Sequence, residues 1–162
     1  MKVPVIDLEE IYGIRNEFIT YGLDKFDKSK FSLIKNDNFI KPHGGLWSCP
    51  VDSEYNWKDW CVGEGVKNKK LSNWFKLKLS KDSIIFVIDN INDLSELHKM
   101  GEIRTFYGDR YLDFEKLSKS LDGILLTDKG ESDTRFTHPG LRGWDVESLL
   151  VFNPEVIEVV EE

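Results

Sequence analysis

A single glutamate, Glu147, stands near the start of an apolar run late in the sequence. This run, residues 143–157, reads Gly-Trp-Asp-Val-Glu-Ser-Leu-Leu-Val-Phe-Asn-Pro-Glu-Val-Ile, and an earlier run, 121–127, reads Leu-Asp-Gly-Ile-Leu-Leu-Thr. Both have the composition of β-strands. Two such strands can place one carboxylate at the rim of a cleft. The alternative is an ordinary exposed strand-end carboxylate, because the chain has 29 acidic residues and glutamate is mostly a surface residue.

A second group of residues suited to binding begins at Lys41. It reads Lys-Pro-His-Gly-Gly-Leu-Trp-Ser-Cys-Pro, and two further tryptophans follow at Trp57 and Trp60. Paired glycines allow positive φ and close approach of a ligand to the backbone, while Trp, His and Ser offer stacking and hydrogen bonds. The segment therefore predicts a site for a small flat ligand. The alternative is a tight turn in which Trp47 fills the core and Trp57 and Trp60 share one helix face.

Length and composition predict one globular domain, residues 1–162. The chain is 40% hydrophobic and 31% charged, which is enough for a core of its own. No apolar run approaches the roughly 20 residues of a membrane span, and residues 1–7 lack the apolar region of a secretory signal, so we expect a cytoplasmic protein without a membrane partner. The net charge of −7 disfavours binding to duplex nucleic acid through phosphate contacts.

The cysteines and histidines do not predict a metal site. Cys49 and Cys61 stand alone, with no second pair and no histidine at zinc-finger spacing, so two buried thiols are the expectation. His98 lies in a predicted helix, where a structural role is expected, and His138 lies beside a proline, where an exposed loop histidine is expected.

Hydrophobic periodicity predicts several short strands with few intervening helices. Strands are expected over 17–23, 74–79 and 84–88, with a short extended piece at 31–34 before a polar turn at 35–38. Helices are expected over 92–100 and 113–121, and a polar loop over 129–143. The strands are not regularly separated by crossover helices and no G-x-G-x-x-G follows a strand, so the pattern favours a mixed α+β domain over a doubly wound one.

The order of these motifs resembles the ADP-ribosyltransferase superfamily over residues 17–157. In that family a strand of the type D-G-I-L-L precedes one that opens with the catalytic glutamate and closes in F-N-P-x-x-I, as in residues 122–126 and 147–157. Its first strand ends in a motif bearing Arg, His or Tyr, and a glycine-rich strand then carries an aromatic residue or Ser. Tyr21-Gly22 and residues 44–48 resemble these two elements. The resemblance implies an α+β fold with a split mixed β-sheet and a few flanking short helices.

The resemblance also implies a reaction and roles for individual residues. NAD would be the substrate, with no metal, and Glu147 would bind the ribose 2′-hydroxyl and help activate an acceptor. Tyr21 or Trp47 would stack on nicotinamide, Ser48 or a glycine amide would orient its carboxamide, and Lys41 would neutralise the pyrophosphate. His43 would contact the adenosine or phosphate side, or cap the turn of the two glycines. The residues implied in NAD binding are Tyr21, Gly22, Lys41, His43, Gly44, Gly45, Leu46, Trp47 and Ser48.

Some features depart from the family. The first strand has no clear Arg, there is no Tyr-His-Gly-Thr string, and Asp145 replaces the Glu or Gln that stands two residues before the catalytic glutamate in arginine-specific members. The acceptor therefore stays open between protein and nucleic acid. The expectation is an ADP-ribosyltransferase, a toxin or phage effector with an antitoxin or inhibitor protein as a further partner.

Two alternatives stand beside the transferase. One is a binding module on the same fold, without catalysis, that recognises a nucleotide or a protein. The other is an RNA 2′-phosphotransferase, which needs a cluster of Arg and His around a phosphate. The five arginines are scattered along the chain and only three histidines exist, so the second alternative has little support.

Overall fold

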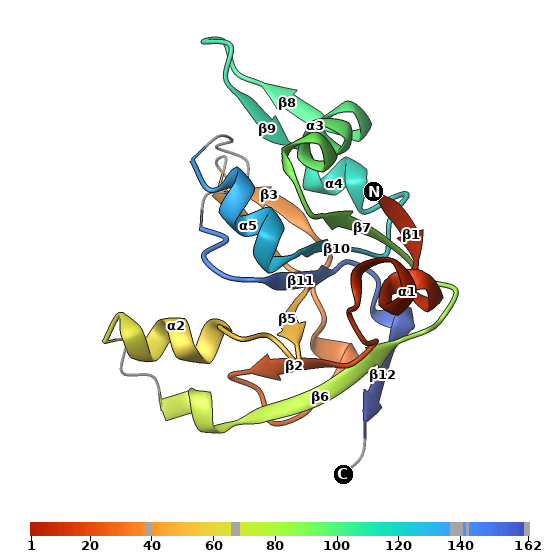
Figure 1. Cartoon of the computed structure of the whole chain (residues 1–162), viewed down its shortest axis with the longest axis vertical. Helices are drawn as coiled ribbons and strands as arrows, with labels where there is room; N and C mark the ends of the chain where they lie inside the picture. Colours follow the sequence, from red (N-terminus) through yellow and green to blue (C-terminus); the bar gives the residue numbers. More distant parts are fainter. Residues whose placement is uncertain (38–39, 66–68, 137–140, 142, 161–162) are drawn as a thin grey trace.

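The computed structural model describes residues 1–37, 40–65, 69–136, 141 and 143–160. They form a mixed α+β architecture in which a long sheet carries short helices on its flanks (Figure 1). The strands are β1 (Lys2–Pro4), β2 (Phe18–Tyr21), β3 (Lys35–Asp37), β4 (Ile40–His43), β5 (Leu46–Pro50), β6 (Trp74–Leu79), β7 (Ile84–Ile88), β8 (Glu102–Arg104), β9 (Arg110–Leu112), β10 (Gly123–Leu126), β11 (Ser148–Val151) and β12 (Ile157–Val160). The α-helices are α1 (Leu8–Tyr12), α2 (Trp57–Gly63), α3 (Ile91–Met100), α4 (Phe114–Leu117) and α5 (Asp128–Thr134). Short 3₁₀ turns are η1 (Val5–Asp7), η2 (Lys28–Lys30), η3 (Lys69–Ser72) and η5 (Pro154–Val156).

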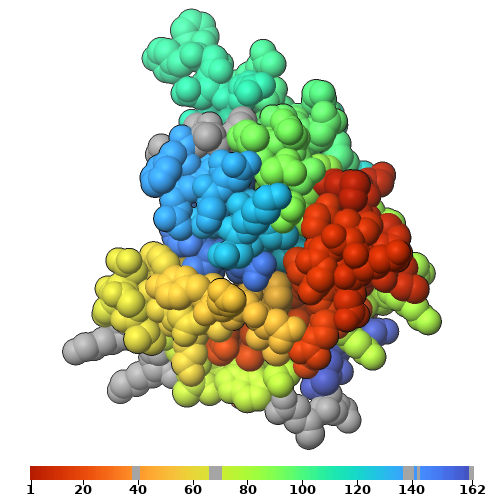
Figure 2. Space-filling view, viewed as in Figure 1, coloured from red at the N-terminus to blue at the C-terminus, as the bar shows by residue number. Residues whose placement is uncertain are grey.

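The main sheet has eight strands in the order β1-β7-β10-β11-β5-β2-β6-β12. β10 pairs with β7 in parallel, and the other neighbours in this sheet pair antiparallel. β3 pairs with β4, and β8 pairs with β9, in two small ribbons apart from the sheet. The β8–β9 ribbon protrudes from the body of the molecule (Figure 2).

The sheet splits at β5, because this strand changes its neighbour halfway along. Residues 46–48 of β5 pair with β11, whereas residues 49–50 pair with β2 on the other edge. The first residues of β11 and the last residues of β2 therefore diverge from β5. Thr20 partly closes this gap, since its Oγ1 donates a hydrogen bond to the carbonyl of Trp47 at 3.1 Å. The divergence leaves room for a pocket between the two halves of the sheet.

The core lies on both faces of the β7–β10–β11 region. Phe86, Ile88 and Ile124 pack against helices α3 and α4 on one face. Ile85 and Leu125, one residue out of phase with them, pack with β1, β2 and β6 on the other. Because alternate residues of a strand point to opposite faces, burial on both faces accounts for the continuous apolar runs in the sequence.

Several predicted elements are confirmed. Strands occur at 18–21, 74–79, 84–88, 123–126 and 148–151, and α3 covers the predicted helix at 92–100. In β6 the apolar residues are buried and Trp74 and Lys78 are exposed, as the alternation predicts. The helix predicted over 113–121 is shorter, because its regular part ends at Leu117. Cys49 and Cys61 are free buried thiols, as expected.

Two local predictions are wrong. The polar loop expected from residue 129 begins instead as helix α5, which is capped by Thr127 through a hydrogen bond from the amide of Gly130. Gly130 lies within this helix and lets it pack closely on β7, because a Cβ at this position would lie 2.0 Å from the carbonyl oxygen of Ile88. The polar turn expected at 35–38 is strand β3 over residues 35–37, and residues 31–34 form no strand.

Some sequence predictions fall outside the described residues. His138 and most of the loop 137–143 belong to this group, as does Asn38 of the predicted turn. Among the helices that the structure describes, none is long and apolar enough to cross a membrane.

Candidate functional site

A pocket of about 340 Å³ occupies the gap where β5 changes its neighbour. We call it the β5 pocket. It is lined by Ile19, Tyr21, Lys41, Trp47, Ser48, Cys49, Trp57, Glu147 and Ser148. These residues come from β2, β4, β5, α2 and the start of β11, so five separate segments meet at this place. The split in the sheet is what brings them together.

Glu147 lies in this pocket with both carboxylate oxygens held. Oε1 accepts a hydrogen bond from Oγ of Ser53 at 2.5 Å, and Oε2 accepts one from the backbone N–H of Asp128 at 3.1 Å. The side chain is only 9% exposed. Burial raises the pKa of Glu147 above its usual value, and the two hydrogen bonds partly oppose that shift. The result is a fixed and poorly solvated carboxylate at the pocket wall.

Lys41 supplies the positive charge of the pocket. Its Nζ lies 4.7 Å from the ring centre of Trp47 and 5.1 Å from that of Trp57, so the ammonium group sits between two aromatic rings. Burial lowers its pKa, and Asp145 opposes this shift from a longer distance. Within the described part of the chain, Lys41 forms no ion pair with a carboxylate. A desolvated cation without a carboxylate partner favours an anionic ligand group.

Ser48 presents a buried hydroxyl group in the pocket wall. It is 8% exposed, lines the pocket, and its Oγ has no hydrogen-bond partner among the residues that the structure describes. Buried polar atoms are usually satisfied, so an unpaired hydroxyl in a pocket wall indicates a polar ligand atom. Burial raises the pKa of the neighbouring Cys49 thiol to about 12, which disfavours its thiolate form.

The aromatic residues of the pocket differ in how much ring they offer. Trp47 meets Lys41 and also Trp144, whose ring centre is 4.8 Å away in an edge-on arrangement. Trp57 stacks on Trp60 at 4.9 Å, so Lys41 and Trp60 occupy its faces. Tyr21 is half-buried, and burial raises the pKa of its hydroxyl, which keeps it neutral. Nζ of Lys58 lies 6.0 Å from the ring centre of Tyr21, so Tyr21 also has a cation near its ring, at a longer distance than the tryptophans have.

The structure brings five of the predicted site residues into this pocket and leaves five outside it. Glu147, Tyr21, Lys41, Trp47 and Ser48 line the pocket, and the remaining residues Gly22, His43, Gly44, Gly45 and Leu46 do not.

The residues outside the pocket have structural roles. His43 is exposed, and its Nε2 lies 2.7 Å from a carboxylate oxygen of Asp37 on the neighbouring strand β3. Leu46 belongs to the core. The glycine pair has positive φ, and a Cβ on Gly44 would lie 2.2 Å from the carbonyl oxygen of Leu33. The pair therefore accommodates neighbouring backbone, while Gly22 lies at the end of β2 with open space around it.

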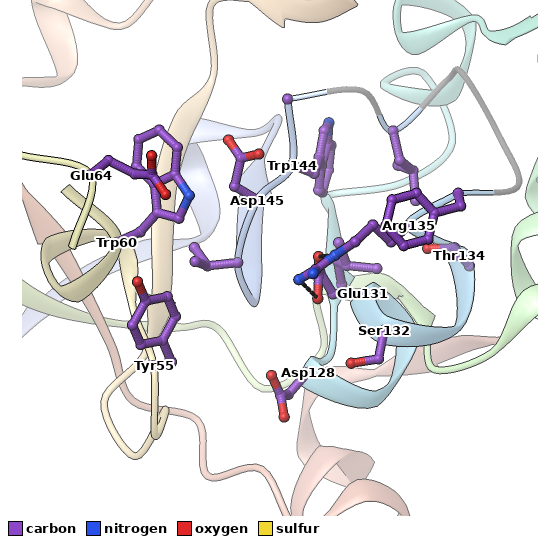
Figure 3. A pocket seen from close by; sticks show the side chains of 15 residues that line it. Tyr55, Trp60, Glu64, Asp128, Glu131, Ser132, Thr134, Arg135, Trp144 and Asp145 are labelled. Atoms are coloured by element: carbon purple, nitrogen blue, oxygen red, sulfur yellow. Dashed lines mark hydrogen bonds and ion pairs between the residues drawn. The ribbon is translucent and has the colours of Figure 1, made fainter.

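A larger cavity of about 910 Å³ lies next to this pocket, between helix α5 and helix α2 with the residues that flank α2. We call it the α5 cleft. Figure 3 shows Tyr55, Trp60 and Glu64 on one side of it, and Asp128, Glu131 and Arg135 on the other. Asp145 and Trp144 also line it. Arg135 donates two hydrogen bonds to the carboxylate of Glu131, at 2.7 and 2.9 Å.

Sequence reasoning missed two parts of the site. Ser53 was not singled out, because a serine in a polar loop has no distinguishing pattern. The α5 cleft was missed because residues 129–135 look like a loop. The acidic and aromatic composition of 55–64 and 128–145 was visible, but only the structure shows that these segments face each other. Among the described residues no group of three or more His, Cys, Asp or Glu is placed to hold a metal.

Comparisons with protein-family models, with curated proteins and with solved structures give no match to this chain.

Proposed function

We propose that this protein is an NAD-dependent ADP-ribosyltransferase that transfers ADP-ribose to a macromolecular acceptor and releases nicotinamide. The observation that carries the proposal is the convergence of Glu147, Tyr21, Lys41 and Ser48 on one pocket at the split in the sheet. These residues are far apart along the chain, and the resemblance implies roles for all of them in a single reaction. The mixed sheet, which divides at β5, supports the split sheet that the resemblance to this family implies.

Each group has a role that suits its surroundings. Cleavage of the bond between nicotinamide and C1′ of the ribose leaves positive charge on the sugar, as in glycoside hydrolysis. The fixed carboxylate of Glu147 stabilises this charge, which is largest at the transition state. Nicotinamide departs with the bonding electron pair, and an acceptor atom forms the new bond to C1′ with its own lone pair and gives up one proton to solvent.

The remaining groups bind the two ends of NAD. The ring of Tyr21 stacks on nicotinamide, and the unpaired hydroxyl of Ser48 bonds to the carboxamide. Lys41 faces the pyrophosphate, which supplies the anion that its ammonium group lacks within the described protein. The pocket holds this one anchoring cation among its described lining residues, so the phosphates are expected close to it.

The test is nicotinamide release from NAD by the purified protein, with and without a bacterial lysate as acceptor. The variant Glu147→Gln keeps the size of the side chain and removes the charge. Glu158→Gln is the matched control, since Glu158 is an exposed carboxylate on β12. Release by the wild type and the control, but not by Glu147→Gln, supports the proposal.

The alternative, a nucleotide-binding module without catalysis, predicts a different pattern. NAD would then raise the melting temperature of the protein, and no nicotinamide would appear under any condition. If NAD neither raises the melting temperature nor loses nicotinamide, both NAD hypotheses fail.

A further inference from the structure

The β8–β9 ribbon ends in two aromatic side chains that no other described part of the chain covers. Phe106 is 96% exposed and Tyr107 is 88% exposed, and their rings meet edge-on with centres 5.6 Å apart. We call residues 105–109 the ribbon tip. The ribbon protrudes from the body of the molecule (Figure 2). Because adjoining exposed apolar groups often mark an interaction site, the tip is a candidate contact point.

Hydrogen bonds within the turn fix the shape of the ribbon tip. The backbone N–H of Thr105 donates to the carbonyl of Asp109 at 2.8 Å, and that of Gly108 donates to the carbonyl of Thr105 at 3.0 Å. The N–H of Asp109 donates to Oγ1 of Thr105 at 3.1 Å. A fixed turn loses little conformational freedom when it binds, so the two rings are preorganised to enter a pocket.

Two arginines flank the tip and favour an acidic partner surface. Nε of Arg104 and Nε of Arg110 lie 3.0 and 3.6 Å from the carboxylate of Glu102, so two exposed guanidinium groups share one carboxylate. Residues 102–112 hold two acidic and two basic residues, whereas the whole chain carries −7. Two copies of such a chain repel each other at long range, so a contact between them needs locally opposite charges.

The α5 cleft has the complementary surface. Three large hydrophobic side chains are the most exposed among the described residues, and while two stand on the ribbon tip, the third, Phe136 at 94%, lines the cleft. Tyr55 also lines it and is 48% exposed. The cleft carboxylates Glu64, Asp128 and Asp145 form no ion pair with a basic side chain in the described part of the chain. The cleft thus combines uncovered apolar surface with unpaired negative charge.

A buried donor in the cleft wall indicates that another group completes it. Trp144 lines the cleft and is 4% exposed, and its Nε1 has no hydrogen-bond partner among the residues that the structure describes. Buried donors are usually paired. The size of the cleft, about 910 Å³, also suits a pair of aromatic rings, since cavities of about 300–1,000 Å³ hold ligands of drug size.

We propose that the ribbon tip docks in the α5 cleft of a second copy of this chain. Phe106 and Tyr107 pack against the aromatic residues of the cleft, and the two arginines face its carboxylates. Because the tip is exposed in its own chain, the cleft that receives it belongs to the other copy. Two such contacts, exchanged between the copies, close a symmetric dimer, the commonest type of assembly. The contact does not depend on the transferase reaction.

The aromatic groups supply enough area for a stable dimer. Each aromatic side chain buries about 150–250 Å², and two tips contribute four of them. Together with the cleft surface that they cover, the buried area reaches the roughly 1,200–2,000 Å² of a specific interface.

The first test is sedimentation of the full chain, without NAD, over a range of protein and salt concentrations. The wild type is expected to sediment as a dimer that weakens as salt increases. The double variant Phe106→Ser with Tyr107→Ser should raise the dissociation constant about 30-fold or more, as for buried aromatic anchors. Leu33→Ser is the matched control, since it removes another exposed apolar side chain, 76% exposed, and should leave the dimer intact. Circular dichroism should show the same fold in all of them.

The second test reverses the charge of the cleft. Glu64→Lys with Asp145→Lys changes two exposed carboxylates of the cleft and should give a monomer. Glu10→Lys with Glu158→Lys is the control, because both side chains are exposed outside the cleft and the net charge changes by the same amount. This control should remain a dimer.

Mixing the two defective variants tests the contact itself. The tip variant keeps an intact cleft, and the cleft variant keeps an intact tip, so one contact can form between them. The labelled cleft variant should therefore bind the unlabelled tip variant one to one, although neither associates with itself. The inference is overturned if the wild type is a monomer throughout, if the cleft variant dimerises as well as its control, which would indicate contact between two tips, or if the mixed variants do not bind. Since NAD takes no part, none of these outcomes bears on the proposed transferase.

Discussion

The β5 pocket and the α5 cleft are neighbouring cavities that differ in size, in the elements that line them and in the burial of their charged residues. The β5 pocket is small, largely apolar and formed mainly by strand residues, and of its polar groups Glu147 and Ser48 are buried and Lys41 is half-buried. The α5 cleft is larger, and its charged residues stand on helix α5 and on the segments after α2 and before β11. A fixed carboxylate in the first can act on a bond, whereas exposed carboxylates in the second can select a partner by charge. The β5 pocket is therefore suited to act on a bound molecule, and the α5 cleft is suited to recognise a partner.

The largest effect should come from the carboxylate that lies between the two cavities. Glu147→Gln is expected to reduce nicotinamide release about 100- to 1000-fold, the usual cost of a preorganised electrostatic group. Burial raises the pKa of Glu147 in the folded protein, so ionising this side chain costs more free energy in the folded than in the unfolded chain. The unfolding free energy of the wild type therefore falls as pH rises through the folded-state pKa of Glu147. Glu147→Gln has no ionisable group at this position, so its unfolding free energy should not show this fall. Thermal melts at pH 5 and pH 8 should show it less sensitive to rising pH than the wild type, and a variant that loses activity only through unfolding would contradict this.

The next largest effect should come from Gly130, where helix α5, one wall of the α5 cleft, packs closely against β7. Gly130→Ala would force a Cβ to within 2.0 Å of the Ile88 carbonyl oxygen, so α5 must move away from β7. We expect a loss of about 1–3 kcal/mol of unfolding free energy, typical of overpacking, measured by urea denaturation. Gly13→Ala is the control, since it has positive φ but no close neighbour, and only the conformational cost of about 1 kcal/mol should remain. Equal losses in both variants would show that close packing at Gly130 is unimportant.

The two regions also differ in how far the sequence predicts them. Residues such as Ile19 of β2 and Leu149 of β11 lie in apolar runs that are typical of buried strands, so the strands that flank the β5 pocket could be predicted. The convergence of Tyr21, Lys41 and Glu147 was expected only from the order of motifs, since no pattern in the sequence reports that β5 exchanges its neighbours. The α5 cleft could not be predicted, because a short helix rich in Gly, Ser and Asp has the composition of a loop.

Removal of the cation of the β5 pocket should give a smaller effect. Lys41→Met keeps a stem of similar length against Trp47 and Trp57 and removes the charge. If Lys41 binds the pyrophosphate, the KM for NAD should rise roughly tenfold, as for a lost charge-assisted hydrogen bond, with a smaller change in kcat. Since burial lowers the pKa of Lys41, its charge costs folding energy at neutral pH, and the variant should be at least as stable as the wild type. Lys78→Met on the exposed face of β6 is the control, and an unchanged KM in Lys41→Met would remove the pyrophosphate role.

The smallest effect concerns Ser53, which holds Glu147 from the loop before α2. Its hydroxyl donates to Oε1 and so favours the charged form, which lowers the pKa of Glu147 against the effect of burial. Ser53→Ala removes this bond, and the pKa of Glu147 should therefore rise further. Because the carboxylate acts in its ionised form, the acid limb of the pH–rate profile should move to higher pH, with a loss of severalfold near neutral pH and little change at high pH, in keeping with one hydrogen bond. Ser53→Thr should restore the limb, and Ser118→Ala, on an exposed turn after α4, should leave it in place. A uniform loss of rate at all pH values would show that Ser53 acts on the shape of the pocket rather than on the charge of Glu147.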